Sequence, residues 1–452
     1  MLTSLTYSTA RIRPRDRDAI IQSLRAGVVP RVGQQHIQVG RADEVAALVD
    51  DIDRIADGGS AFRLIVGEYG AGKSFFLNLV RSIALERKLV TIHADLSPER
   101  RLQATGGQAR GLYAELMRNL STRAKPEGGA MQSVVERFIT VCLNAARSQG
   151  ARPETVIRQR LADLQEMVGG YDFAEVIAAY WHAYDTGDDQ LRSDVVRWLR
   201  GEFSTRTDSR QALGVRTIID DRTFYDHLKL LARLVRLAGF SGLLVCLDEM
   251  VNLYKMSHTR ARNSNYEQVL RILNDCLQGS AAGLGFVFGG TPETLLDTRR
   301  GLYSYPALQS RLAENTFTRK GLVDYSGPVI RLANLSPEDM YVLLTKLRHV
   351  FAGGDPAAYL LPDDALEAFM RHCASRIGDA YFRTPRTTIK EFVNLLAVLD
   401  QNPGVRWPEL VDRVEIQVET NPDLAPIESD DGTSPPPPTA EDADDNLVHF
   451  RL

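Results

Sequence analysis

The stretch GEYGAGKS, Gly67 to Ser74, constrains the fold of this chain more than any other feature. It satisfies the pattern G-x-x-x-x-G-K-[ST] and lies between an apolar run, FRLIVG, and a segment with helical periodicity, SFFLNLVRSIALERK. Such a turn directs backbone amides and the positive end of a helix dipole at bound phosphates. The sequence therefore predicts an α/β fold with a parallel sheet and a nucleotide site at this turn.

Each position of this turn has an expected part in nucleotide binding. Lys73 is expected to bridge the β- and γ-phosphates, and the hydroxyl of Ser74 is expected to bind Mg²⁺. A chance match to the pattern is the alternative, and the flanking strand and helix argue against it. The residues expected to contact the nucleotide are Gly67, Glu68, Tyr69, Gly70, Ala71, Gly72, Lys73, Ser74 and Phe75.

A second apolar run, GLLVCLDEM, ends in two acids, Asp248 and Glu249. At the carboxyl end of a parallel strand both side chains would emerge where α/β sheets bind ligands. Asp248 is expected to hold Mg²⁺, and Glu249 to orient and polarise the attacking water. Alone, the pair would be read as a solvated acidic turn. After a phosphate loop, it predicts Mg²⁺-dependent nucleotide hydrolysis.

The order of these motifs resembles that of the AAA+ ATPases, in particular their origin-recognition-like branch. The segment IQVGR (37–41) precedes an acidic helix and resembles the stretch that this family places over the adenine. The resemblance implies contacts from Val39 and Gly40 to the base, and ATP rather than GTP as the ligand. It also implies an αβα sandwich followed by a C-terminal helical lid.

The AAA+ resemblance implies three further site residues. Thr291 follows the apolar strand GLGFVFGG and matches the polar residue that contacts the γ-phosphate or the water, although TPETLL is equally good helix-capping sequence. Arg311 matches the arginine finger that reaches a neighbouring subunit, with Arg299 and Arg300 as competitors. Arg386 resembles the lid arginine that reaches the γ-phosphate. For both Arg311 and Arg386 a solvated surface arginine is the alternative.

The spacing of the motifs predicts the domain organisation. A compact ATPase core needs far fewer residues than those between Lys73 and Asp248, so we expect a helical insertion. It has no catalytic constellation of its own. The expected regions are an ATPase core at 1–330 with its insertion at about 122–223, a helical lid at 331–420, a disordered acidic and Pro-rich linker at 421–446, and a C-terminal peptide at 447–452.

Composition narrows the class of protein. The chain has no run of 18 apolar residues and no apolar signal core at its start, so we expect a cytoplasmic protein with no membrane partner. Its four cysteines lack metal-ligand spacing and are expected to be buried thiols. Residues 421–446 carry eight acids and no Lys or Arg. The rest is slightly basic, which permits DNA binding without arguing for it.

Five strings in the chain stand out together: GEYGAGKSFFLNLVR, HADLSPERRL, LDEMVNLYK, GGTPETLLD and RTPRTTIKEFVNLL. As a set they resemble the bacterial P-loop family that includes BrxD, the ATP-binding protein of BREX phage-defence systems. This resemblance implies an ATPase that acts beside other defence proteins, such as a large helicase, and we expect it to form a homo-oligomer.

Two other functions stay open. One is a slow nucleotide-dependent switch that recruits a partner, and the other is a DNA-loading ATPase of the origin-recognition type. No recognition helix follows the expected lid, which argues against the second. The peptide LVHFRL (447–452) is either a docking segment for a partner or for the chain's own body, or a frayed terminus.

Overall fold

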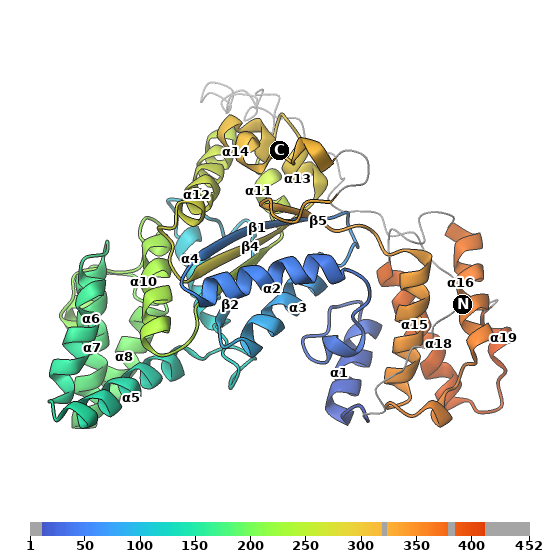
Figure 1. Cartoon of the computed structure of the whole chain (residues 1–452), viewed down its shortest axis with the longest axis horizontal. Helices are drawn as coiled ribbons and strands as arrows, with labels where there is room; N and C mark the ends of the chain where they lie inside the picture. The colour runs from blue at the N-terminus through green and yellow to red at the C-terminus, as the bar shows by residue number, and fades with distance from the viewer. Residues whose placement is uncertain (1–10, 319–322, 378–384, 412–452) are drawn as a thin grey trace, which may run out of the picture. The chain divides into compact units, whose positions relative to one another are not determined.

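A five-stranded parallel sheet forms the centre of the fold (Figure 1). The structure is a computed structural model that describes residues 11–318, 323–377 and 385–411. The strand order is β2-β3-β4-β1-β5, so β4 lies between β1 and β3. The α/β prediction with a parallel sheet is confirmed. The strands are β1 (Ser60–Val66), β2 (Val90–Asp95), β3 (Leu243–Asp248), β4 (Leu284–Gly290) and β5 (Val329–Arg331).

Helices cover both faces of the sheet, which explains why its central strands are apolar throughout. On one face lie α2 (Ala42–Ala56) and α3 (Lys73–Glu86), as Figure 1 shows. Side chains alternate along β1, so Ile65 packs with this layer and Leu64 packs with the opposite one.

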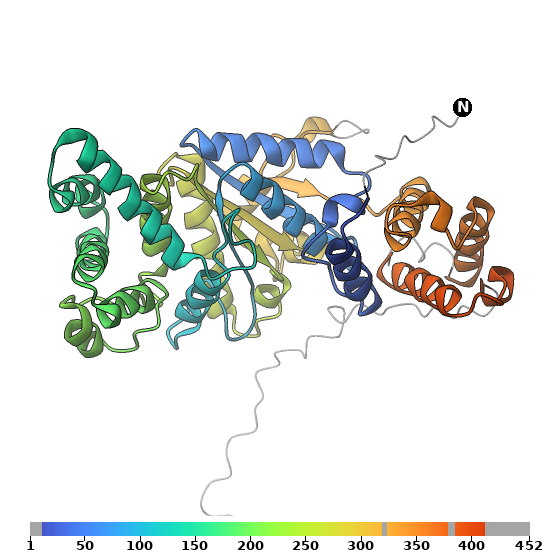
Figure 2. The same ribbon diagram turned by 90° about the horizontal axis from the view of Figure 1, so that it is seen from below.

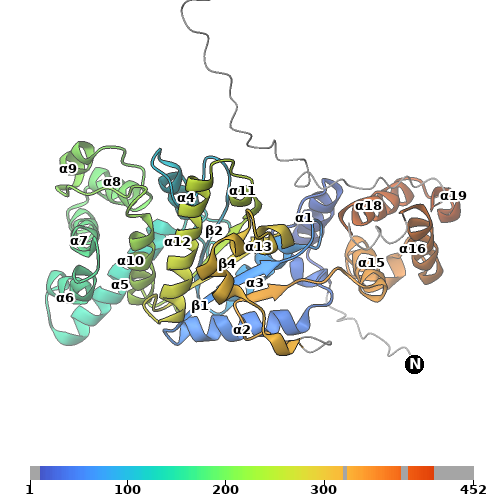
Figure 3. The ribbon, with the colours of Figure 1, turned by 90° about the horizontal axis from the view of Figure 1, so that it is seen from above.

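The second face is covered by α4 (Gln108–Arg118), α10 (Phe224–Leu237) and α12 (Thr259–Leu277). Figure 3 shows α10 and α12 next to each other. The hydroxyl of Tyr225 on α10 donates to Asp275 on α12 over 3.0 Å, which joins the two helices beside the sheet.

The long segment between β2 and β3 contains a group of helices, as the sequence predicted (Figure 2). Their apolar side chains form one continuous core with α10 and the second face of the sheet. These helices are α5 (Met131–Gln149), α6 (Pro153–Gln165), α7 (Gly170–Thr186), α8 (Asp189–Leu199) and α9 (Arg206–Leu213).

The end of this helical segment caps α4. The carboxylate of Asp221 accepts hydrogen bonds from the backbone amides of Gly107 (2.7 Å) and Arg110 (2.8 Å). Both amides belong to the start of α4, where no intrahelical partner is available. A negative charge at this end is also favoured by the helix dipole.

Most of the described residues after 331 are helical, and the first of these helices starts at the capping pattern SPED, which begins with Ser336. Ser336 and Asp339 make a reciprocal capping box at the start of α15. The N-terminal helix α1 (Pro14–Arg25) contributes Ile20 to the apolar cluster of these helices, here called the C-terminal helices. They are α15 (Pro337–Phe351), α16 (Asp363–Ile377), α18 (Pro385–Gln401) and α19 (Trp407–Val411).

Short helices follow the carboxyl ends of two central strands: α11 (Val251–Tyr254) after β3, and α13 (Pro292–Leu296) and α14 (Pro306–Leu312) after β4. All four cysteines are buried and free, as expected. Within the described part of the chain, no helix is long and apolar enough to cross a membrane. The predicted linker (421–446) and terminal peptide (447–452) lie outside the described residues.

Candidate nucleotide site

The loop from Gly67 to Gly72 joins β1 to α3 at the carboxyl edge of the sheet. Gly70 and Gly72 have φ angles of 78° and 79°, a left-handed conformation that side chains other than glycine rarely adopt. Lys73 begins α3, and its Nζ donates to the backbone oxygens of Gly67 and Glu68, both at 2.9 Å. The loop thus curls around the amino group that was predicted to bind phosphate.

Ser74 and Asp248, the two predicted Mg²⁺ ligands, are in direct contact. The Ser74 hydroxyl donates to Oδ2 of Asp248 over 2.6 Å, although the residues are far apart in the chain. Gly289 on the neighbouring strand makes room for this contact, because a Cβ there would overlap the Asp248 carboxylate. Two hard oxygen ligands therefore meet beside the phosphate loop, which is the ligand type that Mg²⁺ prefers.

Glu249 and Thr291 lie at the same edge of the sheet. Glu249 is exposed and has a φ of 61°, and its backbone amide donates to Oδ1 of Asp248 over 2.9 Å. Thr291 directly follows β4, the strand between the phosphate-loop strand and the Asp248 strand. Thr291 is also buried and caps α13, accepting a bond from the Thr294 amide. The predicted cap is confirmed, and the γ-phosphate contact stays a prediction.

The C-terminal helices reach the phosphate loop through Arg386. Its guanidinium donates to the Gly27 backbone oxygen (2.5 Å) and to the Tyr69 hydroxyl (3.4 Å). Phe75, one residue past Ser74, packs against the apolar cluster of the C-terminal helices. Two residues of the predicted set therefore connect the loop to this region.

The segment proposed to lie over adenine is held by α15. Val39 packs against the apolar cluster of the C-terminal helices, and the Lys346 ammonium donates to the Gln38 backbone oxygen. Gly40 has a φ of 59°, and a Cβ there would be tight against the Asp339 carboxylate. The segment that precedes α2 is therefore in contact with α15 through its backbone, and with the apolar cluster of the C-terminal helices through the Val39 side chain.

Arg311 lies at the exposed end of α14. Its guanidinium donates to the backbone oxygen of Ala307, one turn earlier in the same helix, over 3.0 Å. Its competitors differ in their contacts: Arg300 donates to the Met256 backbone oxygen, whereas the Arg299 side chain is exposed. A role for Arg311 in a neighbouring subunit stays a prediction.

Arg41 contacts the phosphate loop but was not among the predicted site residues. Its guanidinium donates to the backbone oxygen of Ala71 and, at 3.4 Å, to that of Ala333. Burial lowers the pKa of Arg41, against the opposing effect of Glu44 and Asp339. Because a peptide's C=O and N–H point in opposite directions, holding the Ala71 oxygen turns the Gly72 amide the other way. Arg41 could have been found from the sequence, because it is the last residue of IQVGR, directly after the predicted site residue Gly40.

Asp95 is a second residue that the sequence reasoning missed. It ends β2 opposite Asp248 in the parallel register. Partial desolvation, and then the neighbouring charge of Asp248, raise the pKa of the Asp95 carboxyl, although the residue is still exposed at the end of its strand. Asp95 is the third residue of the string HADL, and only the pairing of β2 with β3 reveals that it lies opposite Asp248, the predicted metal ligand.

The sequence of the whole chain agrees with this geometry. Residues 12–415 match the family described as BREX system ATP-binding protein BrxC/D. The chain belongs to this family. The match spans most of the sequence and includes the phosphate loop, the acidic pair and the C-terminal helices. The chain is therefore an ATP-binding protein of a phage-defence system. No curated protein matches it.

The residues at the loop fit ATP and a magnesium ion. The left-handed glycines leave the loop open to phosphate oxygens, and Lys73 supplies the positive charge. Ser74 and Asp248 would hold the metal, which takes one or two protein ligands and completes its shell with water and phosphate oxygens.

Proposed function

We propose that this member of the BREX ATP-binding family hydrolyses ATP with Mg²⁺ and uses the nucleotide state to control assembly and its engagement of DNA or a partner protein. The contact between Ser74 and Asp248 carries the proposal, because it brings a hydroxyl and a carboxylate together beside the Lys73 loop. Mg²⁺ there would neutralise charge on the β- and γ-phosphate oxygens.

In the proposed reaction Glu249 accepts a proton from the attacking water. The oxygen of that water bonds to the γ-phosphorus, the bond to the β–γ bridging oxygen breaks, and ADP and phosphate leave. Thr291 would position the water or the γ-phosphate from the end of the central strand. Lys73 would hold the β- and γ-phosphates throughout.

The site would be completed by two arginines. Arg386 already lies against Tyr69 of the phosphate loop, which supports a lid role for residues 331–420. Arg311 is exposed at the end of α14, which supports a role in a neighbouring copy of a homo-oligomer. A cation at the transferring phosphoryl group is worth roughly 10³ or more in rate when it is present. This arrangement is that of an AAA+ ATPase.

A slow nucleotide-dependent switch is the second candidate. The polar contact of Arg386 with the loop is exposed and made by one side chain, so it is suited to forming and breaking as the nucleotide changes. In this function the chain would act as a cytoplasmic scaffold that recruits a helicase or another defence protein. A DNA-loading role of the origin-recognition type is the third, and the described residues add nothing in its favour.

The rate of ATP hydrolysis, measured with and without DNA, separates these functions. We expect Glu249→Gln to lower kcat by about 10² to 10⁴ and to leave ATP binding intact, because it removes the base and keeps the site. Negligible turnover by the wild type under every condition, with tight ATP binding, would favour the switch. Lys73→Ala tests the site itself, since binding of ATP equal to wild type would contradict the whole assignment.

A further inference from the structure

The turn after β3 carries backbone strain at the proposed catalytic base. Glu249 adopts a φ of 61°, in the left-handed region that residues with a side chain rarely occupy because of steric strain. This conformation turns the chain sharply between Asp248 and α11 and leaves the Glu249 side chain exposed at the carboxyl edge of the sheet. Such a conformation persists only when neighbouring groups hold it.

The β4 side of the turn is held by the backbone. The Met250 amide donates over 3.0 Å to the oxygen of Gly289, the same glycine that makes room for Asp248. The Glu249 amide is occupied by the Asp248 carboxylate. These bonds fix the inner edge of the turn but do not connect it to β2.

A side chain holds the β2 side. Asn252 donates from Nδ2 to the Leu96 backbone oxygen over 2.8 Å, while its own backbone amide donates to the Glu249 oxygen over 3.0 Å. The Leu96 amide in turn donates to the Asp248 backbone oxygen over 3.0 Å. Leu96 is therefore bonded at both its amide and its oxygen to the turn that carries Glu249.

We propose that Asn252 is a positioning residue for Glu249, and that its side-chain amide keeps the strained turn docked on the end of β2. This inference rests on the proposed hydrolysis reaction. Among the described contacts, Asn252 bonds the backbone of Glu249, and its side chain bonds Leu96 rather than a residue predicted to bind the nucleotide or the metal. It acts by holding the backbone oxygen of Glu249 and the backbone oxygen of Leu96 at a fixed separation. The orientation of the base towards the water then depends on β2 as well as on β3.

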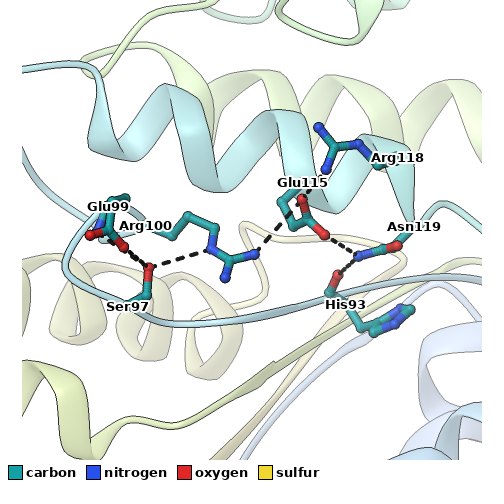
Figure 4. Close-up of polar contacts among 7 residues, drawn as sticks. All are labelled: His93, Ser97, Glu99, Arg100, Glu115, Arg118 and Asn119. Carbon is teal, nitrogen blue, oxygen red and sulfur yellow. Dashed lines mark hydrogen bonds and ion pairs between the residues drawn. The ribbon is translucent and has the colours of Figure 1, made fainter.

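The same strand offers a matched control. Asn119, at the end of α4, donates from Nδ2 to the His93 backbone oxygen over 3.0 Å, as Figure 4 shows. This bond joins an asparagine amide to a carbonyl of β2, whereas Asn252 bonds the carbonyl of Leu96 directly after the strand, and both asparagines are half-buried. Asn119 additionally bonds Glu115 on its own helix, so its surroundings are purely structural. Its loss should cost stability of a similar kind without moving Glu249.

The test compares kcat, ATP affinity and thermal stability of Asn252→Ala, Asn252→Asp and Asn119→Ala in the full chain. We expect both Asn252 variants to lower kcat by about 10- to 100-fold with ATP affinity within about threefold, because a misplacement of about 1 Å costs up to roughly 10² in rate. Asn252→Asp keeps the size of the side chain, removes the donor and adds a negative charge, whereas Asn252→Ala removes the donor without adding a charge. Asn119→Ala should keep kcat within about twofold.

A double variant separates positioning from general damage. In the Glu249→Gln background we expect Asn252→Ala to change the residual rate by less than about twofold, because the group that it positions is already lost. Equal losses of kcat in the Asn252 and Asn119 variants, or an unchanged kcat in both Asn252 variants, would overturn the inference while leaving the proposed function in place. If the single variant Glu249→Gln hydrolysed ATP at the wild-type rate, the proposed function itself would be overturned.

Discussion

The phosphate loop meets the sheet and the C-terminal helices through different kinds of contact. On the sheet side, Ser74 bonds Asp248 over 2.6 Å, and the Gly67 amide bonds the Gly290 backbone oxygen. On the helical side, the exposed Arg386 contacts the Tyr69 hydroxyl at 3.4 Å. Short contacts within a sheet restrict movement, whereas a long side chain at the surface can release and rebind. The sheet side is thus suited to holding ligands, and the helical side to responding to them.

Arg311 lies on α14 and belongs neither to the sheet side nor to the helical side of the loop. Its substitution is expected to have the largest effect of those considered, and it tests whether these two sides complete the site. We expect Arg311→Ala to lower kcat by roughly 10³, because it would remove the cation that a neighbouring subunit supplies. Mixing Arg311→Ala with Glu249→Gln protein should restore part of the activity, since some interfaces then contain both intact residues. Steady-state rates of the separate and mixed proteins measure this.

The exposed Arg299, on the loop before α14, is the control for Arg311. Arg299→Ala should stay within about twofold of wild type. If the mixture of the two inactive variants gains no activity, the role of Arg311 in a second copy is wrong. The site would then consist only of residues from the sheet side and the helical side of one copy of the chain.

The sheet side should be sensitive to the charge of a single carboxylate. Asp248→Asn is expected to lower kcat by about 100-fold or more, because a bound metal ion stabilises the transition state by several kcal/mol. Asp95→Asn, which changes the neighbouring carboxylate in the same register, should have an effect of a few fold at most. Rates over a range of Mg²⁺ concentrations distinguish the two. Equal losses would show that Asp95 also binds the metal.

The helical side should give a smaller effect that falls on turnover. Arg386→Ala is expected to lower kcat by about 10-fold or somewhat more, the usual worth of a hydrogen bond to a charged group. Tyr69→Phe removes the described 3.4 Å contact and keeps the arginine, so it should change kcat by no more than about threefold. A larger effect of Tyr69→Phe would mean that Arg386 acts by bonding Tyr69 and not by binding a phosphate.

The last prediction concerns stability in acid rather than turnover, on the sheet side. Burial, and then the charges of Arg81 and Arg31, lower the pKa of His93 on β2 to about 3. The unfolded chain binds this proton below about pH 6.5 and the folded chain does not, so stability falls as the pH falls from 6.5 towards 3. His93→Gln should reduce this loss by ~1 kcal/mol per pH unit in urea unfolding. The exposed His182, changed to Gln, should leave the pH profile as it was.

Local patterns predicted the elements that lie next to one another in the chain. The apolar run, the glycines and the helical period around Lys73 gave the β1–α3 turn, and Ser336 gave the start of α15. The short strand β5 was missed, since three residues carry too little pattern to identify it.

Contacts between distant residues could not be predicted in the same way. No periodicity reveals that β4 lies between β1 and β3, which puts Thr291 near the phosphate loop. Nor does it reveal that Asn252 bonds Leu96, or that Arg386 bonds Gly27, because these residues are far apart in sequence. The sequence therefore predicted most residues of the candidate site, whereas the contacts that position those residues come only from the structure.

The bond between Asp221 and the start of α4 decides where the inserted helices can be removed. A deletion of residues 122–223, the boundaries that the sequence suggests, would also remove the cap from the helix that follows β2. Loss of such a cap costs about 0.5–2 kcal/mol. A shortened chain that rejoins before Ile219 keeps the carboxylate and spares the nucleotide end of the sheet. Because the inserted helices share one apolar core with α10, any replacement for them must also cover the apolar face of α10.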